Sequence, residues 1–324
     1  MDWLMEIEMS FILFLQQLGN WLEVPFQGFT FLGNELFFLL VMPAIYWSIN
    51  PQIGFRAGMM LVLSGGLNSC VKMLFHSPRP YWVDARVQAL SSETSFGIPS
   101  GHAQNSAAIW GIIATSIRKK WALAAAAVVV FFIGLSRLYL GVHFIRDVLV
   151  GWLIGALLVV LYLKLEKPTA KWLAARSFGV QLLISFVFSI FLIALGILCQ
   201  ATSTGWELPS AWINQAVAAG AEAPTPYSLE GVITIAGVAF GFTAGYAWWQ
   251  KKFGKPEIKA SSIKRLARYL IGLLGILALY IGLKYIFPQE PIIVEGVFRF
   301  VRYALIGVWV SAAAPLLFKK LHLE

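Results

Sequence analysis

Charged residues are scarce in this sequence. Only 13% of its 324 residues are charged and 59% are hydrophobic, whereas soluble globular domains average about 25% charged residues. The deficit excludes a water-exposed surface over most of the chain and indicates that its solvent is lipid. Several apolar stretches reach the roughly 20 residues that a membrane-spanning helix needs.

Cysteines and N-terminal basic residues are scarce too. Cys70 and Cys199 are the two cysteines, and both stand in apolar runs, so we expect packing residues rather than a disulfide. The first ten residues contain no Lys or Arg, which argues against a cleavable signal peptide. The net charge of +9 is dispersed in short basic clusters between apolar runs. That distribution is typical of membrane proteins, so we expect no nucleic-acid partner.

The apolar stretches predict an all-α fold, a polytopic bundle of transmembrane helices. Nine spans are expected, at about residues 30–49, 53–75, 100–117, 121–139, 143–164, 179–199, 229–249, 266–286 and 296–318. Residues 3–27 mix apolar and polar side chains and predict an amphipathic helix that lies in the membrane interface and ends at Pro25; a tenth span is the alternative. The expected parts are the N-terminal interfacial helix (1–28), a core (29–165) and a four-span C-terminal module (166–324).

Basic residues lie on alternate connections between these spans. Seventeen of the 25 do so: Arg56, Arg118, Lys119, Lys120, Lys164, Lys167, Lys171, Arg176, Lys251, Lys252, Lys255, Lys259, Lys264, Arg265, Arg268, Lys319 and Lys320. The connection 201–228 contains Glu207 and Glu222 but no basic residue. By the positive-inside rule this pattern predicts an external N-terminus and a cytoplasmic C-terminus. It suits a bacterial inner membrane, and also the endoplasmic reticulum.

Glycines four residues apart predict close helix packing at two places, Gly151 with Gly155 and Gly237 with Gly241 and Gly245. Ordinary glycine abundance in membrane helices is the alternative. The four C-terminal spans contain no histidine and no acid–base cluster. We interpret them as a packing, dimerising or lipid-access module, which leaves both a monomer and a homo-oligomer open.

Two clusters combine cations with groups that take part in catalysis. Lys72, at the end of the second span, is followed seven residues later by Arg79; alone, this is equally explained by a lysine that reaches the membrane surface and a loop arginine. Arg137 is followed by His143 and Asp147, whose spacing of four places them on one face of a helix. The carboxylate can accept from one imidazole nitrogen and leave the other free to attack. A purely structural His–Asp pair is the alternative.

A further cluster, Pro99–Ser100–Gly101–His102, opens the third span. Proline fits a first helical turn, and the free backbone N–H groups there favour an anion. Ser100 can donate a hydrogen bond, Gly101 permits close backbone approach and His102 can donate a proton. A proline-capped helix with an incidental histidine is the alternative.

The predicted topology brings all three clusters to one membrane face. They gather five cations or potential cations around a single acid, Asp147. Such a site suits a compact polyanion, of which phosphate is the obvious one. Arg79 and Arg137 can each clamp two oxygens, while Lys72 acts as a point charge. Positive charge aimed at the phosphoryl oxygens favours phosphoryl transfer.

These residues resemble the three-part signature of the type 2 phosphatidic acid phosphatase superfamily. Its parts stand here in order as Lys72-x6-Arg79-Pro80, Pro99-Ser100-Gly101-His102 and Ser136-Arg137-x5-His143-x3-Asp147. The resemblance covers about residues 30–165. It implies a membrane lipid phosphatase that needs no metal or cofactor and whose site faces away from the cytoplasm. The sequence departs from the usual six-span core at its N-terminal segment and in its four extra C-terminal spans.

The resemblance also implies a role for each residue. His143 would attack phosphorus and form a phosphohistidine, Asp147 would orient it, and His102 would protonate the leaving oxygen. The phosphoryl group would be held by Lys72, Arg79, Ser100, Gly101 and Arg137. A lipid phosphotransferase of the same superfamily, which passes the phosphoryl group to an acceptor hydroxyl, is the alternative function. A carrier or channel is disfavoured, because it would need polar residues along the C-terminal spans, where they are scarce. A vanadate-dependent haloperoxidase, which would share the anion site, is disfavoured because those relatives are soluble.

The expected partners are the bilayer and a membrane lipid phosphate or diphosphate. Candidates are undecaprenyl diphosphate, phosphatidylglycerol phosphate, phosphatidic acid and lipid A phosphate. Arg86 and Arg146 could bind a second phosphate and would then favour a diphosphate. Residues 81–98 form the expected mouth of the site, as a gate or as an ordinary aromatic loop. His76 and His322 are expected to be simply exposed.

Overall fold

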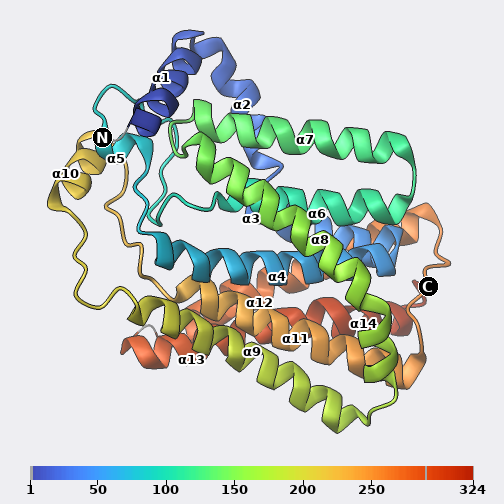
Figure 1. Cartoon of the computed structure of the whole chain (residues 1–324). Helices are drawn as coiled ribbons and strands as arrows, with labels where there is room; N and C mark the ends of the chain where they lie inside the picture. The colour runs from blue at the N-terminus through green and yellow to red at the C-terminus, as the bar shows by residue number, and fades with distance from the viewer. Residues whose placement is uncertain (1–2, 289, 324) are drawn as a thin grey trace. The chain divides into compact units, whose positions relative to one another are not determined.

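The computed structural model describes residues 3–288 and 290–323, which consist of helices and their connections, without a strand (Figure 1). The all-α prediction is confirmed. The helices are α1 (Trp3–Gln17), η1 (Asn20–Leu22), α2 (Glu23–Phe31), α3 (Glu35–Ala44), η2 (Ile45–Ile49), α4 (Pro51–Phe75), α5 (Pro80–Val83), α6 (Gly101–Ile117), α7 (Lys120–Tyr139), α8 (Ile145–Ala174), α9 (Phe178–Ala201), α10 (Ser210–Ala218), α11 (Glu230–Phe253), α12 (Ser262–Ile286), α13 (Ile292–Val308), η3 (Trp309–Ala313) and α14 (Ala314–Lys320).

Seven helical stretches of the described chain are long and apolar enough to cross a membrane. They cover residues 51–83, 120–139, 145–174, 178–201, 230–253, 262–286 and 292–320. The pair 20–31 and 35–49, bent by 49°, adds one if it is counted as a single span. The predicted third span, α6, has only 17 residues, which rise about 25 Å against a hydrocarbon core of about 30 Å. The seven long apolar stretches indicate an integral membrane protein. The count of nine spans stays a prediction.

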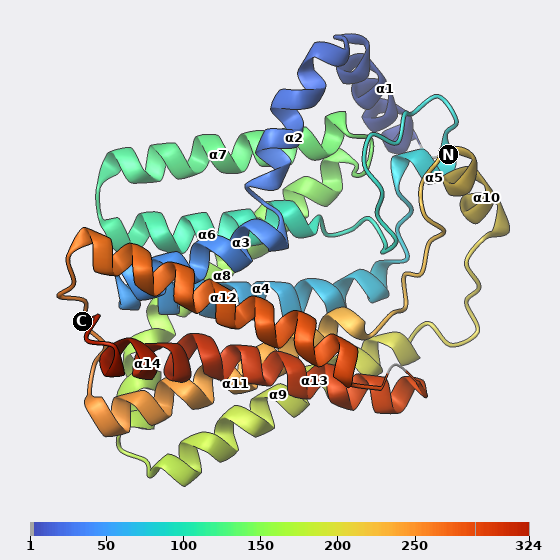
Figure 2. The same ribbon diagram turned by 180° about the vertical axis from the view of Figure 1, so that it is seen from behind.

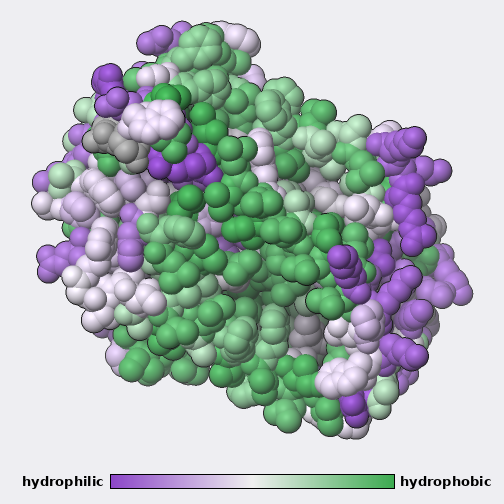
Figure 3. Space-filling model, viewed as in Figure 1, coloured by the Kyte–Doolittle hydropathy of each residue, from purple (hydrophilic) through white to green (hydrophobic). Residues whose placement is uncertain are grey.

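The outward sides of the long helices are apolar. α8 exposes Leu149, Leu153 and Leu157 along one side, and α9 exposes Leu183 and Phe191. On the face drawn in Figure 3, hydrophobic side chains cover the middle of the helices and hydrophilic ones gather toward their ends. A helix satisfies its own backbone hydrogen bonds, so an apolar side of this kind can face lipid directly.

The N-terminal segment differs from its prediction. Residues 3–27 do not form one helix, because the chain breaks at Gly19, whose φ of 107° is readily adopted only by glycine. Pro25 does not end a helix either: it is the third residue of α2, where its missing N–H needs no partner. α1 buries Met9 and Ile12 in a core of side chains from the same unit, and α2 packs along α7 (Figure 2). The interfacial position of this segment stays a prediction.

The chain forms two compact units that interleave in sequence. The first comprises Met1–Phe38, Leu67–Val159 and Ile197–Ser228, and the second comprises Leu39–Gly66, Val160–Gly196 and Leu229–Glu324. This division differs from the contiguous boundaries that the sequence suggested after residues 28 and 165. The physical reason is packing, since residues 39–66 pack with C-terminal helices and residues 197–228 pack with N-terminal ones.

In the first unit, an aromatic core holds the connections that carry the candidate site. Tyr81, Trp82 and Phe96 come from the connection between α4 and α6, and Phe144 comes from the connection between α7 and α8. Each is fully buried. Burying a large aromatic side chain stabilises the fold by about 1.5–3 kcal/mol, so these loops are fixed rather than free.

In the second unit, a stripe of glycines lets α11 approach α13 closely. An added Cβ at Gly237 or Gly241 would meet the backbone of α13, and one at Gly245 would meet Ser311. The predicted packing role of these glycines is therefore confirmed within one chain. Helices in a membrane associate without a hydrophobic driving force, and small residues at their interface allow the close van der Waals packing that stabilises the contact.

Gly241→Ala should lower the thermal stability of the protein, because the new Cβ would overlap the carbonyl of Ala304. Overpacking of this kind costs about 1–3 kcal/mol. Gly282→Ala on α12 is the matched control, since nothing lies within 4 Å of its added Cβ and alanine is the better helix former by about 1 kcal/mol. Thermal unfolding in detergent, followed by circular dichroism, compares them. A melting temperature for Gly241→Ala at or above that of the control would contradict the close packing.

Candidate active site

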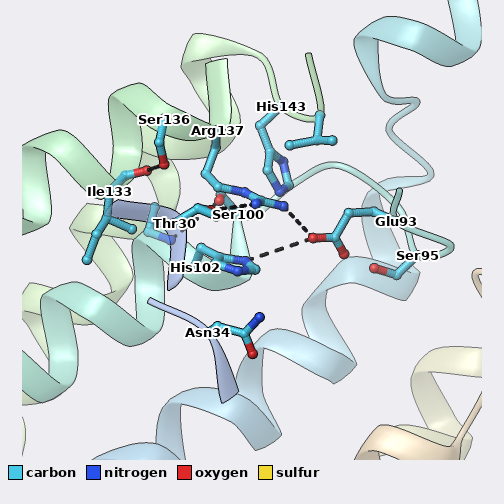
Figure 4. Close-up of polar contacts among 12 residues, drawn as sticks. Thr30, Asn34, Glu93, Ser95, Ser100, His102, Ile133, Ser136, Arg137 and His143 are labelled. Carbon is cyan, nitrogen blue, oxygen red and sulfur yellow. Dashed lines mark hydrogen bonds and ion pairs between the residues drawn. The ribbon is translucent and has the colours of Figure 1, made fainter. Parts of the chain in front are cut away.

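The eight predicted site residues come together at the ends of helices in the first unit. Lys72 and Arg137 lie in the last turns of α4 and α7. Asp147 lies in the first turn of α8, Arg79 precedes α5, and Ser100 is the N-cap of α6. The other three are Gly101, His102 and His143. In the close-up of Figure 4, His143 and His102 lie on either side of the Arg137 side chain.

His143 is fully buried and is held at both ring nitrogens. Its Nδ1 lies 3.1 Å from Asp147 Oδ2, and its Nε2 lies 3.2 Å from Arg79 Nη1. A guanidinium only donates, so Nε2 is the acceptor and the imidazole proton belongs on Nδ1, where Asp147 accepts it. Asp147 Oδ2 also accepts the N–H of Phe144 at 3.0 Å, which fixes the carboxylate. This is the tautomer that a nucleophilic Nε2 requires.

The local structure around this pair differs in one respect from the prediction. α8 begins at Ile145, so His143 precedes the helix instead of lying on its face. The contact with Asp147 forms across the first turn. A second bond ties the pair to α6, because the backbone N–H of Ser100 donates to the carbonyl of Asp147 at 2.9 Å.

Arg79 and Lys72 donate mainly to backbone oxygens. Arg79 Nε donates to Ser95 O at 2.6 Å and its Nη2 to Phe96 O at 3.1 Å. Its Nη1 donates to Val142 O at 2.9 Å. Lys72 Nζ donates to the same carbonyl of Phe96 at 2.7 Å. Both cations are buried, and a buried cation is stable only with such partners.

Arg137 binds two residues that the sequence did not identify as site residues, Thr30 and Glu93. Its Nη1 donates to Thr30 Oγ1 at 2.7 Å, and its Nη2 forms an ion pair with Glu93 Oε1. Glu93 also lies 3.8 Å from Arg79 and 3.9 Å from His102 Nδ1. Figure 4 shows the Glu93 carboxylate directed at Arg137 and His102. Arg137 Nε is buried without a hydrogen-bond partner among the described residues.

Glu93 stays ionised because of these cations. Burial alone would raise its pKa, but the surrounding cations, Arg79 and Arg137 foremost, together outweigh burial and lower the pKa to about 2. The sequence indicates Glu93 only weakly, because it is a single acid in the polar run 91–95 of the expected mouth. No sequence pattern indicates that Thr30 belongs to the site, since it and Arg137 are more than a hundred residues apart in the chain.

Ser100 and Gly101 act first on local structure. Ser100 is fully buried, and its hydroxyl oxygen accepts the N–H of Ala103 at 3.4 Å as an N-cap. A Cβ at Gly101 would come within 3.1 Å of Asn68 Oδ1, so glycine leaves room for that amide. Asn68 in turn donates to the carbonyl of Pro99 at 3.2 Å. These contacts orient the start of α6 toward the site.

The two arginines considered for a second phosphate are each paired with an acid. Arg146 donates from its backbone N–H and from Nε to the buried carboxylate of Glu8, at 2.8 and 2.7 Å. Arg86 donates to Asp84, with Nη2 at 2.6 Å. Neither guanidinium is therefore poised for a diphosphate. Glu8 lies on α1, so the N-terminal helix reaches the segment between His143 and Asp147.

His76 and the two cysteines lie outside the site. His76 is half-buried, with Nε2 2.7 Å from Ser203 Oγ and its ring stacked on Trp206; the expectation that it is simply exposed is wrong. Cys70 and Cys199 are buried and free, as expected. Within residues 3–288 and 290–323, no three His, Cys, Asp or Glu side chains gather in a way that could hold a metal ion.

Glu8→Gln should destabilise the protein, because it leaves the cationic side chain of Arg146 beside a neutral amide. Losing one partner of such a hydrogen-bonded pair costs about 2 kcal/mol. Glu6→Gln, two residues away and exposed, is the matched control and should unfold like the wild type. Thermal unfolding in detergent measures both. Equal melting temperatures for the two variants would show that the Glu8–Arg146 pair contributes nothing.

The comparisons with known proteins agree with the geometry. A family model described as the PAP2 superfamily matches residues 54–171. A second, described as PAP2 superfamily phosphatase, transmembrane extension, matches residues 233–324.

Three curated relatives illustrate the similarity. The chain is 33% identical to phosphatidylglycerophosphatase B of Bacillus subtilis (strain 168), over 43% of this chain and 72% of that protein. It is 30% identical to sphingosine-1-phosphate phosphatase 1 of Rattus norvegicus, over 41% of this chain and 32% of that protein. It is 31% identical to glucose-6-phosphatase 3 of Homo sapiens, over 44% of this chain and 49% of that protein. The chain thus spans half or less of the last two.

A solved structure is also similar, that of a transmembrane PAP2-type phosphatidylglycerolphosphate phosphatase from Bacillus subtilis. It has 27% sequence identity and a TM-score of 0.42, and covers 49% of this chain and 86% of that chain.

Proposed function

This chain belongs to the PAP2 superfamily of phosphatases, and on that premise we propose that it hydrolyses membrane lipid phosphates through a phosphohistidine, without a metal. The observation that carries the proposal is the position of His143. Its Nδ1 faces the carboxylate of Asp147 and its Nε2 faces the guanidinium of Arg79. An imidazole held in this way offers Nε2 to a phosphorus atom that the cations attract.

The proposed reaction has two displacements. In the first, His143 Nε2 attacks phosphorus, the bond from phosphorus to the lipid oxygen breaks, and His102 gives its proton to that oxygen. In the second, water attacks the phosphohistidine, the P–N bond breaks, and His102 accepts the proton of the water. The proton on Nδ1 stays there throughout, and Asp147, which accepts its hydrogen bond, stabilises the positive charge on the phosphorylated ring.

Lys72, Arg79 and Arg137 are proposed to hold the phosphoryl oxygens. Their charge is worth most where water is excluded, and all three are buried. The start of α6 at Gly101 adds the positive end of a helix dipole. The buried Nε of Arg137 supports this role, because it is a donor with no hydrogen-bond partner among the described residues.

The site is proposed to face the exterior of a bacterial inner membrane. The support is the distribution of basic residues, which favours a cytoplasmic C-terminus and places the opposite helix ends outside. Of the substrates considered, a lipid monophosphate is preferred to a diphosphate. The pairing of Arg146 with Glu8 and of Arg86 with Asp84 favours this choice, as do the names of the curated relatives.

Purified wild-type protein should release phosphate from a lipid monophosphate when a chelator is present, and His143→Ala should release none. A panel of phosphatidylglycerol phosphate, phosphatidic acid, undecaprenyl diphosphate and lipid A, with phosphate as the readout, tests both statements. Inactivation by the chelator would exclude the metal-free mechanism, and full activity of His143→Ala would exclude the nucleophile. Phosphate release with water as the sole acceptor separates a hydrolase from a phosphotransferase.

His102→Ala should lower kcat by about 10²–10⁴-fold, the usual contribution of a general acid. The loss should shrink with a substrate whose leaving group needs no proton, such as p-nitrophenyl phosphate, because the acid then has little to do. The ratio of the two kcat values, variant against wild type, is the measurement. An equal loss on both substrates would argue against proton donation.

A further inference from the structure

One short segment of the mouth supplies oxygens to all three site cations. The carboxylate of Glu93 pairs with Arg137 and lies within 4 Å of Arg79 and His102. The carbonyls of Ser95 and Phe96 accept from Arg79, and that of Phe96 also accepts from Lys72. These cations are the ones proposed above to hold the phosphoryl group. The segment 93–96 therefore occupies, with its own oxygens, the donors that a phosphate would use.

Glu93 is the part of this segment that resembles a ligand. It is an anion, it comes from a connection between helices, and its side chain is partly exposed at 26%. Arg137 is by contrast buried, and its Nη2 bonds to Glu93 while Nε has no hydrogen-bond partner among the described residues. A carboxylate has two oxygens where a phosphoryl group has three, so Glu93 resembles a phosphoryl group that is one oxygen and one charge short.

We propose that Glu93 is a specificity residue: its carboxylate occupies the phosphoryl subsite until a dianionic phosphomonoester displaces it, and it thereby excludes monoanionic phosphodiesters. The inference rests on the proposed function. Ordinary membrane phospholipids are phosphodiesters and surround any site that opens to the bilayer surface. A bare cluster of three cations would bind their head groups, whereas the substrate is a minor lipid with a terminal phosphomonoester.

The selection follows from charge and tethering. A tethered group acts at an effective concentration of millimolar order, so a monoanionic diester gains little by replacing one monoanion with another. A phosphomonoester carries about −1.5 to −2 charges at pH 7 and three strong acceptor oxygens, so it gains both charge and hydrogen bonds. Because the pKa of Glu93 is held at about 2, the carboxylate stays in competition at every physiological pH.

Removing the carboxylate should open the subsite to diesters. Full-length wild type and Glu93→Gln, purified in detergent, hydrolyse dioctanoyl phosphatidic acid while dioctanoyl phosphatidylglycerol, a monoanionic diester, is titrated in. The half-inhibitory concentration of phosphatidylglycerol should fall about tenfold in Glu93→Gln, since apparent affinity is reduced by the fraction of sites that are closed. Dioctanoyl phosphatidylcholine, which has no net charge, controls for surface dilution. Glu222→Gln removes an exposed acid of the same unit and should behave like the wild type.

A second measurement needs no turnover. Phosphatidylglycerol should raise the melting temperature of Glu93→Gln but not that of the wild type, whereas orthovanadate should raise both. Equal responses of the two proteins to phosphatidylglycerol would overturn the inference. So would a lower kcat in Glu93→Gln without new diester binding, which would make Glu93 a partner of His102. If wild type releases phosphate from no lipid monoester, the proposed function fails instead, and the melting shifts still decide whether Glu93 excludes diesters.

Discussion

Holding three buried cations side by side is the constraint on which the first unit depends. Lys72, Arg79 and Arg137 repel one another, and each would lose its hydration if left without partners. Backbone carbonyl oxygens and the carboxylate of Glu93 provide these partners. The connection between α4 and α6 is therefore as much a part of the site as the helix ends that carry the cations. Its aromatic side chains, buried in the core of the unit, keep those carbonyls in place.

The N-terminal helices α1 and α2 also support the candidate site. Glu8 on α1 holds the segment between His143 and Asp147 through Arg146. Gln16, the next-to-last residue of α1, donates to the carbonyl of Tyr139 at 3.0 Å. On α2, Thr30 accepts from Arg137. These contacts make the segment a support of the site, and they explain why Glu8 and Gln16 stand among apolar residues.

The proposed chemistry and the proposed selectivity draw on one physical fact. Electrostatic attraction is stronger in a site that excludes water, so the cations both stabilise a phosphoryl transition state and bind unwanted anions tightly. A tethered carboxylate lessens the second effect without removing the first, because a dianion can displace it. The second unit carries none of the eight site residues and is held by close packing of α11 on α13.

The sequence alone determined the class of fold, the membrane setting and the eight residues of the candidate site, because these depend on composition, on periodicity and on spacings within short segments. The spacing of His143 and Asp147 sufficed to predict their contact, even though His143 lies before the helix. Only the tertiary structure decided what neutralises the cations. The contacts of Glu93 with Arg137 and of Glu8 with Arg146 join segments that are 44 and 138 residues apart, and no local pattern encodes a pairing that exists only after the helices have packed.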